Sequence, residues 1–304
     1  MEYISNDIIK IGVKDHGAEL ASLQAKDREY LWQADEMFWK RHSPVLFPIV
    51  GAVWNGEYRS HGNVYAMGQH GFARDMDFTL VHKGSDELRY RLTSDATTKS
   101  RYPYDFVLEI GYKLVGNTVR VIWHVENTGA EEMAFQIGAH PAFFWPLLSS
   151  EAIDGGVDAM LPVLEATDKR GCFQIKADGN TLPISVITEK GCVGKESKVT
   201  LDAGGYLPLN TDTFNADALI FEDYHVSKVT LCDDAKKPYL SLAFSSPLVG
   251  LWSPPRKRAP FVCIEPWYGR TDPAGYTGTY EAKPWMQKLQ PNECFDATYD
   301  ITVE

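Results

Sequence analysis

The alternation of apolar and polar residues is the clearest pattern in this chain, and it predicts β-strands. Over residues 106–114 apolar side chains occupy every second position, with Glu109 and Lys113 between them. The same alternation returns over residues 119–125, after Gly116-Asn117. Successive side chains of a strand point to opposite faces, and a Gly-Asn pair is a turn signal. The two runs therefore predict a β-hairpin with one buried face.

Other segments show the same two-residue period. Residues 295–303 alternate as the hairpin does, and shorter runs predict strands at residues 8–13, 19–23, 239–244 and 261–265. Helical signals are few, and residues 35–41 predict one short helix. The chain shows no internal repeat, low-complexity linker or change in composition that would mark a boundary. Many short strands between turn signals predict an all-β protein, a sandwich or barrel formed as a single domain over residues 1–304.

The charge and cysteine content narrow the function classes. The 41 acidic and 30 basic side chains give a formal charge of −11, which argues against a surface for nucleic acid or anionic membranes. Five cysteines without a C-x-x-C pair argue against a disulfide framework or a zinc site and favour reduced thiols. Residues 1–14 lack the pattern of a signal peptide, and no run of about 18 apolar residues is present to cross a membrane. We therefore expect a soluble, cytoplasmic protein.

Three residues that can transfer protons each stand in an unusual local sequence. They are His70, His140 and Glu265. Imidazole and carboxyl groups are the side chains best suited to donate and remove protons near neutral pH. Aromatic residues, which are frequent around His140 and Glu265, have surfaces against which the apolar faces of a sugar ring pack. Together the three segments suggest acid–base chemistry on a carbohydrate.

His70 is followed by Gly71, which allows a close backbone approach to a ligand or to another strand. Arg74 lies four residues further on. In an extended segment, residues an even number apart share a face, so His70 and Arg74 are expected to converge on one ligand. The alternative is a histidine bonded by a neighbouring strand, with Arg74 in a salt bridge at the rim. Both readings stay open at this point.

His140 precedes Pro141, which holds the histidine backbone extended and ends any helix there. Residues 143–145 are three consecutive aromatics, and one strand cannot bury all three on a single face because successive side chains point to opposite faces. We expect some of these rings to line a cavity or a second core. A packed loop beside the core is the alternative.

Two carboxylates are candidates for the same site. Glu265 ends an apolar run, and a carboxylate at the end of a buried strand is costly unless it is paired or used in chemistry. A salt bridge to Arg270 or Arg258 is the simpler alternative. Asp217 is suited either to bond a hydroxyl group or to cap a turn.

Several site classes lack their sequence signature. There is no G-x-G-x-x-G after a strand, no P-loop lysine, no H-E-x-x-H and no G-x-S-x-G. We therefore expect no nucleotide cofactor, no metal and no nucleophilic serine elbow. A glycoside hydrolase usually has two carboxylates flanking the bond, and only Glu265 has a convincing setting here.

Taken together, the motifs resemble those of the aldose 1-epimerase (galactose mutarotase-like) family, and more closely its less characterised bacterial branch. The resemblance covers most of the chain. Its most specific parts are His-Gly-Phe-Ala-Arg at 70–74, His-Pro-Ala-Phe at 140–143 and Ile-Glu-Pro-Trp at 264–267. Weaker matches lie at residues 17–20, 29–32, 45–51 and 55–56.

The resemblance implies a fold and a set of roles. The family fold is a large antiparallel β-sandwich, called a supersandwich. By position in the motifs, His140 corresponds to the general acid, Glu265 to the general base and His70 to a sugar-binding residue. Asp217 corresponds, through a poorer local match, to an aspartate that binds hydroxyl groups. No cofactor or metal is implied.

Two departures from the family pattern concern the substrate. The well-studied galactose mutarotases carry an arginine before the Asn-Gly segment, where this chain has Val53-Trp54. Their first motif is His-Gly-Gly, whereas this chain has His70-Gly71-Phe72 and continues to Arg74. The second form is similar to the hexose-6-phosphate branch, in which that arginine helps bind substrate.

The resemblance therefore implies an aldose 1-epimerase that interconverts the α and β anomers of a hexose by ring opening and closure. A hexose-6-phosphate 1-epimerase and a non-catalytic carbohydrate-binding or sensor protein are the alternatives. The expected partner is a small-molecule hexose or hexose phosphate, and a homodimer is left open. To act first as an acid His140 must be cationic, and a nearby carboxylate is expected to raise its pKa.

Overall fold

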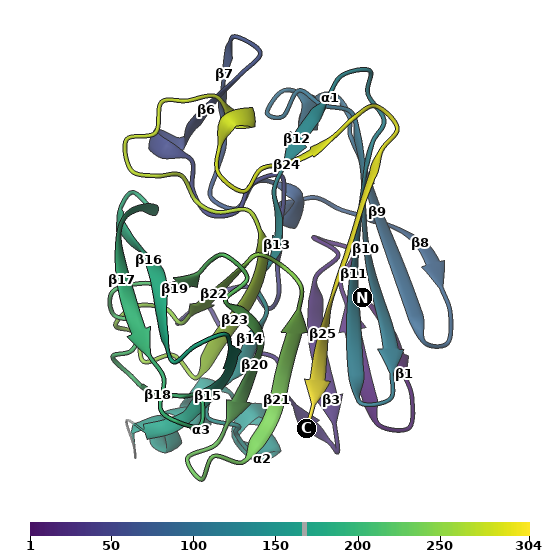
Figure 1. The fold of residues 1–304 in the computed structure, drawn as a ribbon. Coiled ribbons are helices and arrows are strands. Elements are labelled where there is room, and N and C mark those ends of the chain that lie inside the picture. The colour runs from purple at the N-terminus through teal and green to yellow at the C-terminus, as the bar shows by residue number, and fades with distance from the viewer. Residues whose placement is uncertain (166–168) are drawn as a thin grey trace.

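Two large antiparallel sheets, which share one hydrophobic core, form the body of the protein (Figure 1). The computed structural model describes residues 1–165 and 169–304. The nine-stranded sheet has the order β18 (Tyr206–Asn210), β15 (Lys169–Ala177), β20 (Val226–Cys232), β21 (Pro238–Phe244), β25 (Cys294–Val303), β11 (Thr118–Asn127), β10 (Phe106–Val115), β9 (Glu87–Thr93) and β8 (Thr79–Lys83). The eight-stranded sheet has the order β17 (Cys192–Thr200), β16 (Thr181–Glu189), β19 (Leu219–Phe221), β22 (Leu248–Trp252), β23 (Phe261–Tyr268), β13 (Ile137–Ala139) and β5 (Val45–Leu46), and β14 (Ala142–Phe144) also pairs with β23.

Three smaller sheets and a few short helices complete the described structure. The small sheets are β1 (Glu2–Ser5) to β2 (Ile9–Val13), β3 (Leu20–Ala25) and β4 (Arg28–Glu29); β6 (Glu57–Ser60) with β7 (Asn63–Ala66); and β12 (Met133–Phe135) with β24 (Gln287–Leu289). The α-helices are α1 (Ala96–Lys99), α2 (Ser150–Asp154) and α3 (Gly156–Glu165). Single 3-10 turns form η1 (Trp54–Gly56), η2 (Ala73–Asp75) and η3 (Tyr280–Ala282).

The structure confirms the predicted all-β fold and the hairpin. Strands β10 and β11 are ten residues each and pair through Val115 and Thr118, with Gly116 at φ +59° in the turn between them. The even-numbered side chains of β10 and the odd-numbered side chains of β11 are buried in the shared core. The shorter predicted strands appear as β2, β3, β21 and β23, and the C-terminal one as β25. Local alternation was therefore sufficient to locate these strands.

The helix predicted over residues 35–41 is wrong, because the segment forms turns instead. The carboxylate of Asp35 accepts a hydrogen bond from the backbone N–H of Met37 at 2.9 Å. The Nζ of Lys257 donates to the carbonyl oxygens of Met37 and Phe38, at 3.1 and 2.9 Å. In a continuing helix those two carbonyls would accept hydrogen bonds from backbone N–H groups of the next turn. Here they accept hydrogen bonds from the distant side chain of Lys257 instead.

Helices α2 and α3, which the sequence did not predict, cover a second and smaller hydrophobic core. Met160 and Leu164 of α3 pack there with Trp32, Phe144 and Phe261. The three aromatic residues at 143–145 divide between the two cores. Phe144 belongs to the second core, whereas Phe143 and Trp145 belong to the main one. All three rings are buried, and the prediction of a second core is confirmed.

Strand β23 separates these two environments. Its even-numbered residues Val262 and Ile264 belong to the main core between the large sheets. Its odd-numbered residues Phe261 and Cys263 belong to the second core on the opposite face. Because side chains alternate along a strand, Glu265 points to that opposite face as well. The hydrophobic packing of β23 thus directs a carboxyl group away from the main core.

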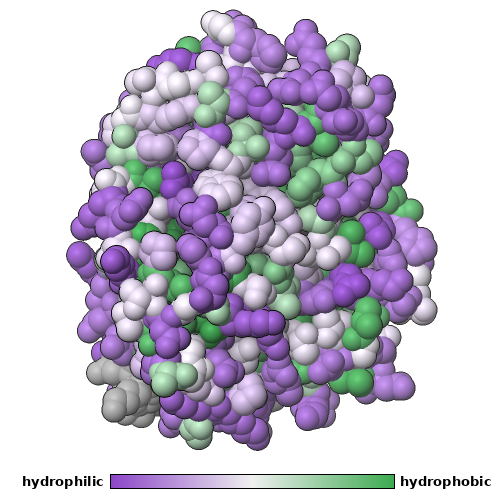
Figure 2. All heavy atoms as spheres, in the orientation of Figure 1, coloured by the Kyte–Doolittle hydropathy of each residue, from purple (hydrophilic) through white to green (hydrophobic). Residues whose placement is uncertain are grey.

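The surface is mostly polar. Figure 2 shows one face on which hydrophilic side chains predominate and hydrophobic ones are scattered. Within residues 1–165 and 169–304, none of the helices has the length and apolar character needed to span a bilayer.

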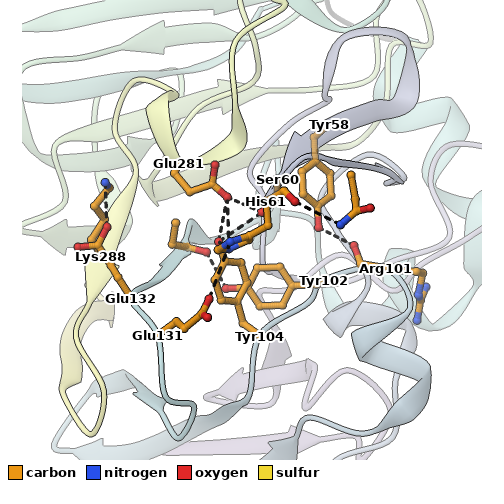
Figure 3. Close-up of polar contacts among 12 residues, drawn as sticks. Tyr58, Ser60, His61, Arg101, Tyr102, Tyr104, Glu131, Glu132, Glu281 and Lys288 are labelled. Carbon is orange, nitrogen blue, oxygen red and sulfur yellow. Dashed lines mark hydrogen bonds and ion pairs between the residues drawn. The ribbon is translucent and has the colours of Figure 1, made fainter.

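A polar cluster fastens the hairpin of β6 and β7 to η3 (Figure 3). The carboxylate of Glu281 accepts hydrogen bonds from the hydroxyl groups of Ser60 and Tyr104, the latter at 2.9 Å. His61 lies at the edge of the cluster, with its Nε2 3.1 Å from the hydroxyl of Tyr104. Ser60 is fully buried, so without Glu281 its hydroxyl group could not form a hydrogen bond to water instead.

We predict that Glu281→Ala lowers the free energy of unfolding by about 1–3 kcal/mol, because two hydroxyl groups lose their charged acceptor. The control is Glu132→Ala, which removes a neighbouring carboxylate paired with the half-exposed Lys288 at 3.0 Å. An exposed pair of this kind is worth about 0–1 kcal/mol. Thermal unfolding followed by circular dichroism measures both variants. Equal effects would show that the cluster contributes no more than a surface ion pair.

Candidate active site

A cleft of about 490 Å³ opens on the face of the eight-stranded sheet to which Glu265 points. Its volume falls within the range typical of small-molecule sites. The five residues singled out in the sequence all line it: His70, Arg74, His140, Asp217 and Glu265. They come from four separate segments, because His70 and Arg74 share one, so the fold brings together groups that are far apart in the chain.

Glu265 forms part of the cleft floor and is 1 % exposed. Across the β22–β23 ladder it faces Gly250, where a Cβ atom would lie 2.4 Å from the ring of Trp267. A glycine is therefore needed beside Glu265 to make room for this indole. Burial raises the pKa of Glu265 well above its ordinary value, and the negative charge of Asp217 adds to the rise.

The alternative of a salt bridge from Glu265 to Arg270 does not hold. The guanidinium of Arg270 lies 2.5 Å from the carboxylate of Glu222 instead. The nearest ionisable partner of Glu265 is His140, with Nε2 and Oε2 3.3 Å apart. Oε2 of Glu265 and Nδ1 of His140 are buried and have no hydrogen-bond partner within the part of the chain that the structure describes. The two side chains thus face each other with bonding capacity left over.

His140 occupies the corner between β13 and β14 and is held there by aromatic rings. Trp39 stacks on the imidazole with ring centroids 4.8 Å apart, and Trp252 meets it edge-on at 5.3 Å. The ring of His70 lies perpendicular to it at 5.4 Å. These contacts leave the imidazole little rotational freedom.

The expected rise in the pKa of His140 is wrong. Burial lowers the pKa to about 3, and the positive charge of Arg74 acts in the same direction. A buried imidazole is favoured as the neutral form, and a buried carboxyl group as the protonated form. Burial therefore favours a neutral His140 and a protonated Glu265 over the ion pair between them. The alternative ion pair contains the same number of protons, so one proton transfer interconverts the two forms.

His70 is fixed by the backbone of Gly51. The N–H of Gly51 donates to Nδ1 of His70 at 3.1 Å, and the N–H of His70 donates to the carbonyl of Gly51 at 2.7 Å. Since Nδ1 accepts a proton donor, the neutral ring carries its own proton on Nε2. His70 has φ +66°, and a Cβ at Gly71 would lie 2.2 Å from the carbonyl oxygen of Phe47. The glycine is thus required for the close approach of another backbone.

Arg74 lines the cleft, although the extended segment expected between it and His70 is wrong. Residues 73–75 form the 3-10 turn η2, and the guanidinium donates to the carbonyl of Gln69 at 2.7 Å. Its Nε, 3.7 Å from Asp75, is buried and makes no hydrogen bond among the described residues. Burial lowers the pKa of Arg74 to about 10, which leaves it cationic at neutral pH. Arg41 and Lys40 line the same cleft.

Asp217 fits both readings given to it. Its Oδ1 accepts the N–H of Ala218 at 2.8 Å, and its own N–H donates to Phe214 at 3.0 Å, so it closes a turn. It also lines the cleft, and its φ of +80° is unusual for a residue other than glycine. Such backbone strain persists where surrounding contacts impose it and is frequent at functional sites.

Three indoles line the cleft, and sequence reasoning missed two of them, Trp39 and Trp252. The third, Trp267, belongs to the motif around Glu265. Trp39 lies in the segment predicted to be a helix, and Trp252 precedes an irregular loop, so neither stood in a recognisable motif. Flat indole faces of this kind are suited to pack against the C–H groups of a sugar ring.

A buried clamp below the cleft was also missed. Lys283 and Asp272 form an ion pair at 2.7 Å, and their side chains are 1 % and 3 % exposed. Asp272 also accepts the N–H of Trp54 at 2.9 Å and donates its own N–H to Ala52 at 2.9 Å. These bonds hold the loop that begins at Gly51, the residue that fixes His70. No signal in the sequence connects segments so far apart.

Known proteins resemble this chain in both sequence and fold. Residues 3–171 match the family model described as aldose 1-epimerase. The chromosomal LacX protein of Lactococcus lactis subsp. lactis is 30 % identical over 309 residues, covering 99 % of this chain and 98 % of that protein. A galactose mutarotase related enzyme from Lactobacillus acidophilus superposes with a TM-score of 0.88 at 32 % identity, covering 100 % of this chain and 97 % of the other. A galactose mutarotase-like protein from Lactobacillus casei gives 0.87 at 28 % identity, with both chains covered completely.

We predict that Asp272→Ala lowers the free energy of unfolding by about 3–5 kcal/mol, because it leaves the ammonium group of Lys283 buried without its partner. The control is Asp300→Ala, which breaks the exposed pair with Arg120 and costs about 0–1 kcal/mol. The double variant Asp272→Ala with Lys283→Met removes both charges and regains most of the loss. Denaturant unfolding measures all three. If Asp272→Ala were as stable as Asp300→Ala, the pair of Asp272 with Lys283 would not act as a stabilising clamp.

Proposed function

Since the chain belongs to the aldose 1-epimerase family, we propose that it is an isomerase that interconverts the α and β anomers of a hexose by opening and reclosing the pyranose ring. One observation carries the proposal. At the floor of a cleft with indole walls, Nε2 of His140 and Oε2 of Glu265 lie 3.3 Å apart. An acid and a base so close together can act on two oxygens attached to the same carbon atom.

In the proposed mechanism Glu265 removes the proton of the anomeric hydroxyl group while His140 delivers a proton to the ring oxygen. The bond between C1 and the ring oxygen breaks, and an open-chain aldehyde results. Rotation about the C1–C2 bond turns the carbonyl over, and reclosure with the two roles reversed gives the other anomer. Protons and electrons balance without any further reactant.

This mechanism requires the charged form of the pair, which differs from the neutral form only in the position of one proton. We infer that a bound sugar supports the charged form, because its hydroxyl and ring oxygens contact both groups and replace the solvent that burial removes. The Nε2–H of His70 is available to donate to a sugar oxygen. The carboxylate of Asp217 is available to accept a hydroxyl proton, and the three indoles pack against the ring.

A phosphorylated hexose is a second candidate substrate, favoured by one observation. Arg74, Arg41 and Lys40 line the same cleft in a chain whose formal charge is −11. The buried Nε of Arg74 has no hydrogen-bond partner among the described residues. A phosphate group, with several acceptor oxygens and two negative charges, would satisfy this guanidinium.

We predict that Glu265→Gln, which keeps the shape of the side chain and removes the base, slows interconversion by about 10²–10⁴-fold. That loss corresponds to about 3–5 kcal/mol of barrier. Polarimetry starting from α-glucose or α-galactose measures the rate above the uncatalysed background. Asp300→Ala is the control and retains the wild-type rate, because Asp300 lies on β25 of the other large sheet and does not line the cleft. Unchanged interconversion by Glu265→Gln would refute its assignment as the base.

The same samples test the non-catalytic alternative. Titration calorimetry measures whether the wild-type protein binds the free hexose. Binding without any acceleration of anomer interconversion would identify a sugar-binding or sensor protein and would contradict the proposed activity. Acceleration that Glu265→Gln abolishes while binding persists supports an enzyme.

We predict that a hexose 6-phosphate is a better substrate than the free hexose, judged by kcat/KM. Arg74→Ala removes the preference by raising KM for the phosphorylated sugar, because one charged hydrogen-bond donor is lost. Arg74→Lys is the matched control, since it keeps the charge and loses the planar guanidinium, and it retains part of the preference. Equal kcat/KM for both sugars in the wild-type protein would exclude phosphate recognition by Arg74.

A further inference from the structure

Cys263 lies next to the acid–base pair, and the proposed mechanism does not use it. It is two residues before Glu265 on β23 and therefore on the same face of the strand. One possible ligand atom from each of His140, Cys263 and Glu265 lies within 4.8 Å of the others. All three residues are buried. A nitrogen, a sulfur and an oxygen thus lie close together at the edge of the cleft, which His140 and Glu265 line and Cys263 does not.

The spacing of these atoms is close to that of a tetrahedral metal site. With metal–ligand bonds of about 2.0 Å, a nitrogen and an oxygen ligand of a tetrahedral Zn²⁺ lie about 3.3 Å apart. Nε2 of His140 and Oε2 of Glu265 are 3.3 Å apart without forming a hydrogen bond to each other. The longer separations, up to 4.8 Å, need an inward movement of about 1 Å to accommodate a sulfur ligand.

The chemistry of the three ligands also fits a particular class of cation. A thiolate and an imidazole favour zinc and similar thiophilic metals over Mg²⁺ or Ca²⁺, which prefer oxygen. The thiolate and carboxylate together balance a divalent charge, while neutral imidazole supplies its electron pair. Oε2 of Glu265 is buried and unpartnered in the described structure, so its electron pairs are free for this use.

We propose that His140, Cys263 and Glu265 form a binding site for a thiophilic divalent cation such as Zn²⁺, which occupies the cleft floor and blocks the sugar. On binding, the thiol of Cys263 and the carboxyl group of Glu265 release one proton each to water, and bonds from the metal to Sγ, Oε2 and an imidazole nitrogen form. The fourth position faces the cleft and takes a water molecule. The cation occupies the electron pairs that proton transfer requires, so it inhibits. The inhibition rests on the proposed function, whereas the binding does not.

Cobalt provides a readout of binding that is independent of activity. Co²⁺ bound by a thiolate gains a charge-transfer absorption band in the near ultraviolet, and Zn²⁺ displaces it. We expect the wild-type protein to show this band with one equivalent of Co²⁺, and Cys263→Ser to lose it. Cys192→Ser is the matched control, because Cys192 is also buried but lies outside the ligand group, beside Gly191 at another wall of the cleft. A band that persists in Cys263→Ser, or is absent from the wild-type protein, would overturn the proposal.

Activity measurements test the inhibition. Each variant is compared with its own rate in the presence of a chelator, and zinc chloride is then added. We expect Cys263→Ser to need at least about tenfold more Zn²⁺ for half inhibition than the wild type or Cys192→Ser, since even residues outside the ligand set commonly change metal affinity by 10–100-fold. Equal sensitivity of all three proteins would overturn the role of Cys263. A cobalt band in a protein that accelerates no sugar interconversion would uphold the cation site and refute the proposed function instead.

Discussion

The burial of one carboxyl group, that of Glu265, is the constraint on which the rest of the cleft depends. Its position follows from the hydrophobic packing of β23, whose residues Val262 and Ile264 lie in the main core. A shift of register by one residue would exchange the two faces and place the carboxyl group in that core. The apolar contacts that stabilise the two large sheets therefore also hold Glu265 at the floor of the cleft, opposite His140.

Removal from water decides how this carboxyl group behaves. The expectation of a cationic His140 assumed that the negative charge of a nearby carboxylate would raise the pKa of the imidazole. In the structure, burial and the charge of Arg74 favour the neutral imidazole, and burial and Asp217 favour the protonated carboxyl group. Both shifts act against two buried charges, and a neutral imidazole beside a protonated carboxyl group still holds the one proton that acid–base chemistry requires.

The parts of the structure that could be predicted from the sequence are those determined by local pattern. Alternation located the hairpin of β10 and β11, and the residue types around His140 and Glu265 identified both as candidates for one cleft. What local pattern could not supply is long-range contact. The Lys257 side chain that prevents a helix after Asp35, and the pair of Asp272 with Lys283, join segments whose separation in the chain carries no signal.

The same physical property explains both proposals for the cleft floor. A group that has lost its solvent and gained no hydrogen bond is poised to bond whatever enters, because the cost of removing water from it has already been met by folding. A sugar offers two oxygens on one carbon atom to His140 and Glu265, and a thiophilic cation offers a positive charge to them and to Cys263. Selectivity must then come from the walls. Indole faces favour a sugar ring, and the cationic side chains of Arg74 and Arg41 oppose a free metal ion while they favour an anionic substrate. The positive charges of Arg74 and Arg41 thus oppose the binding of a cation, whereas the ligands His140, Cys263 and Glu265 favour it. The proposed site requires that the ligands have the larger effect.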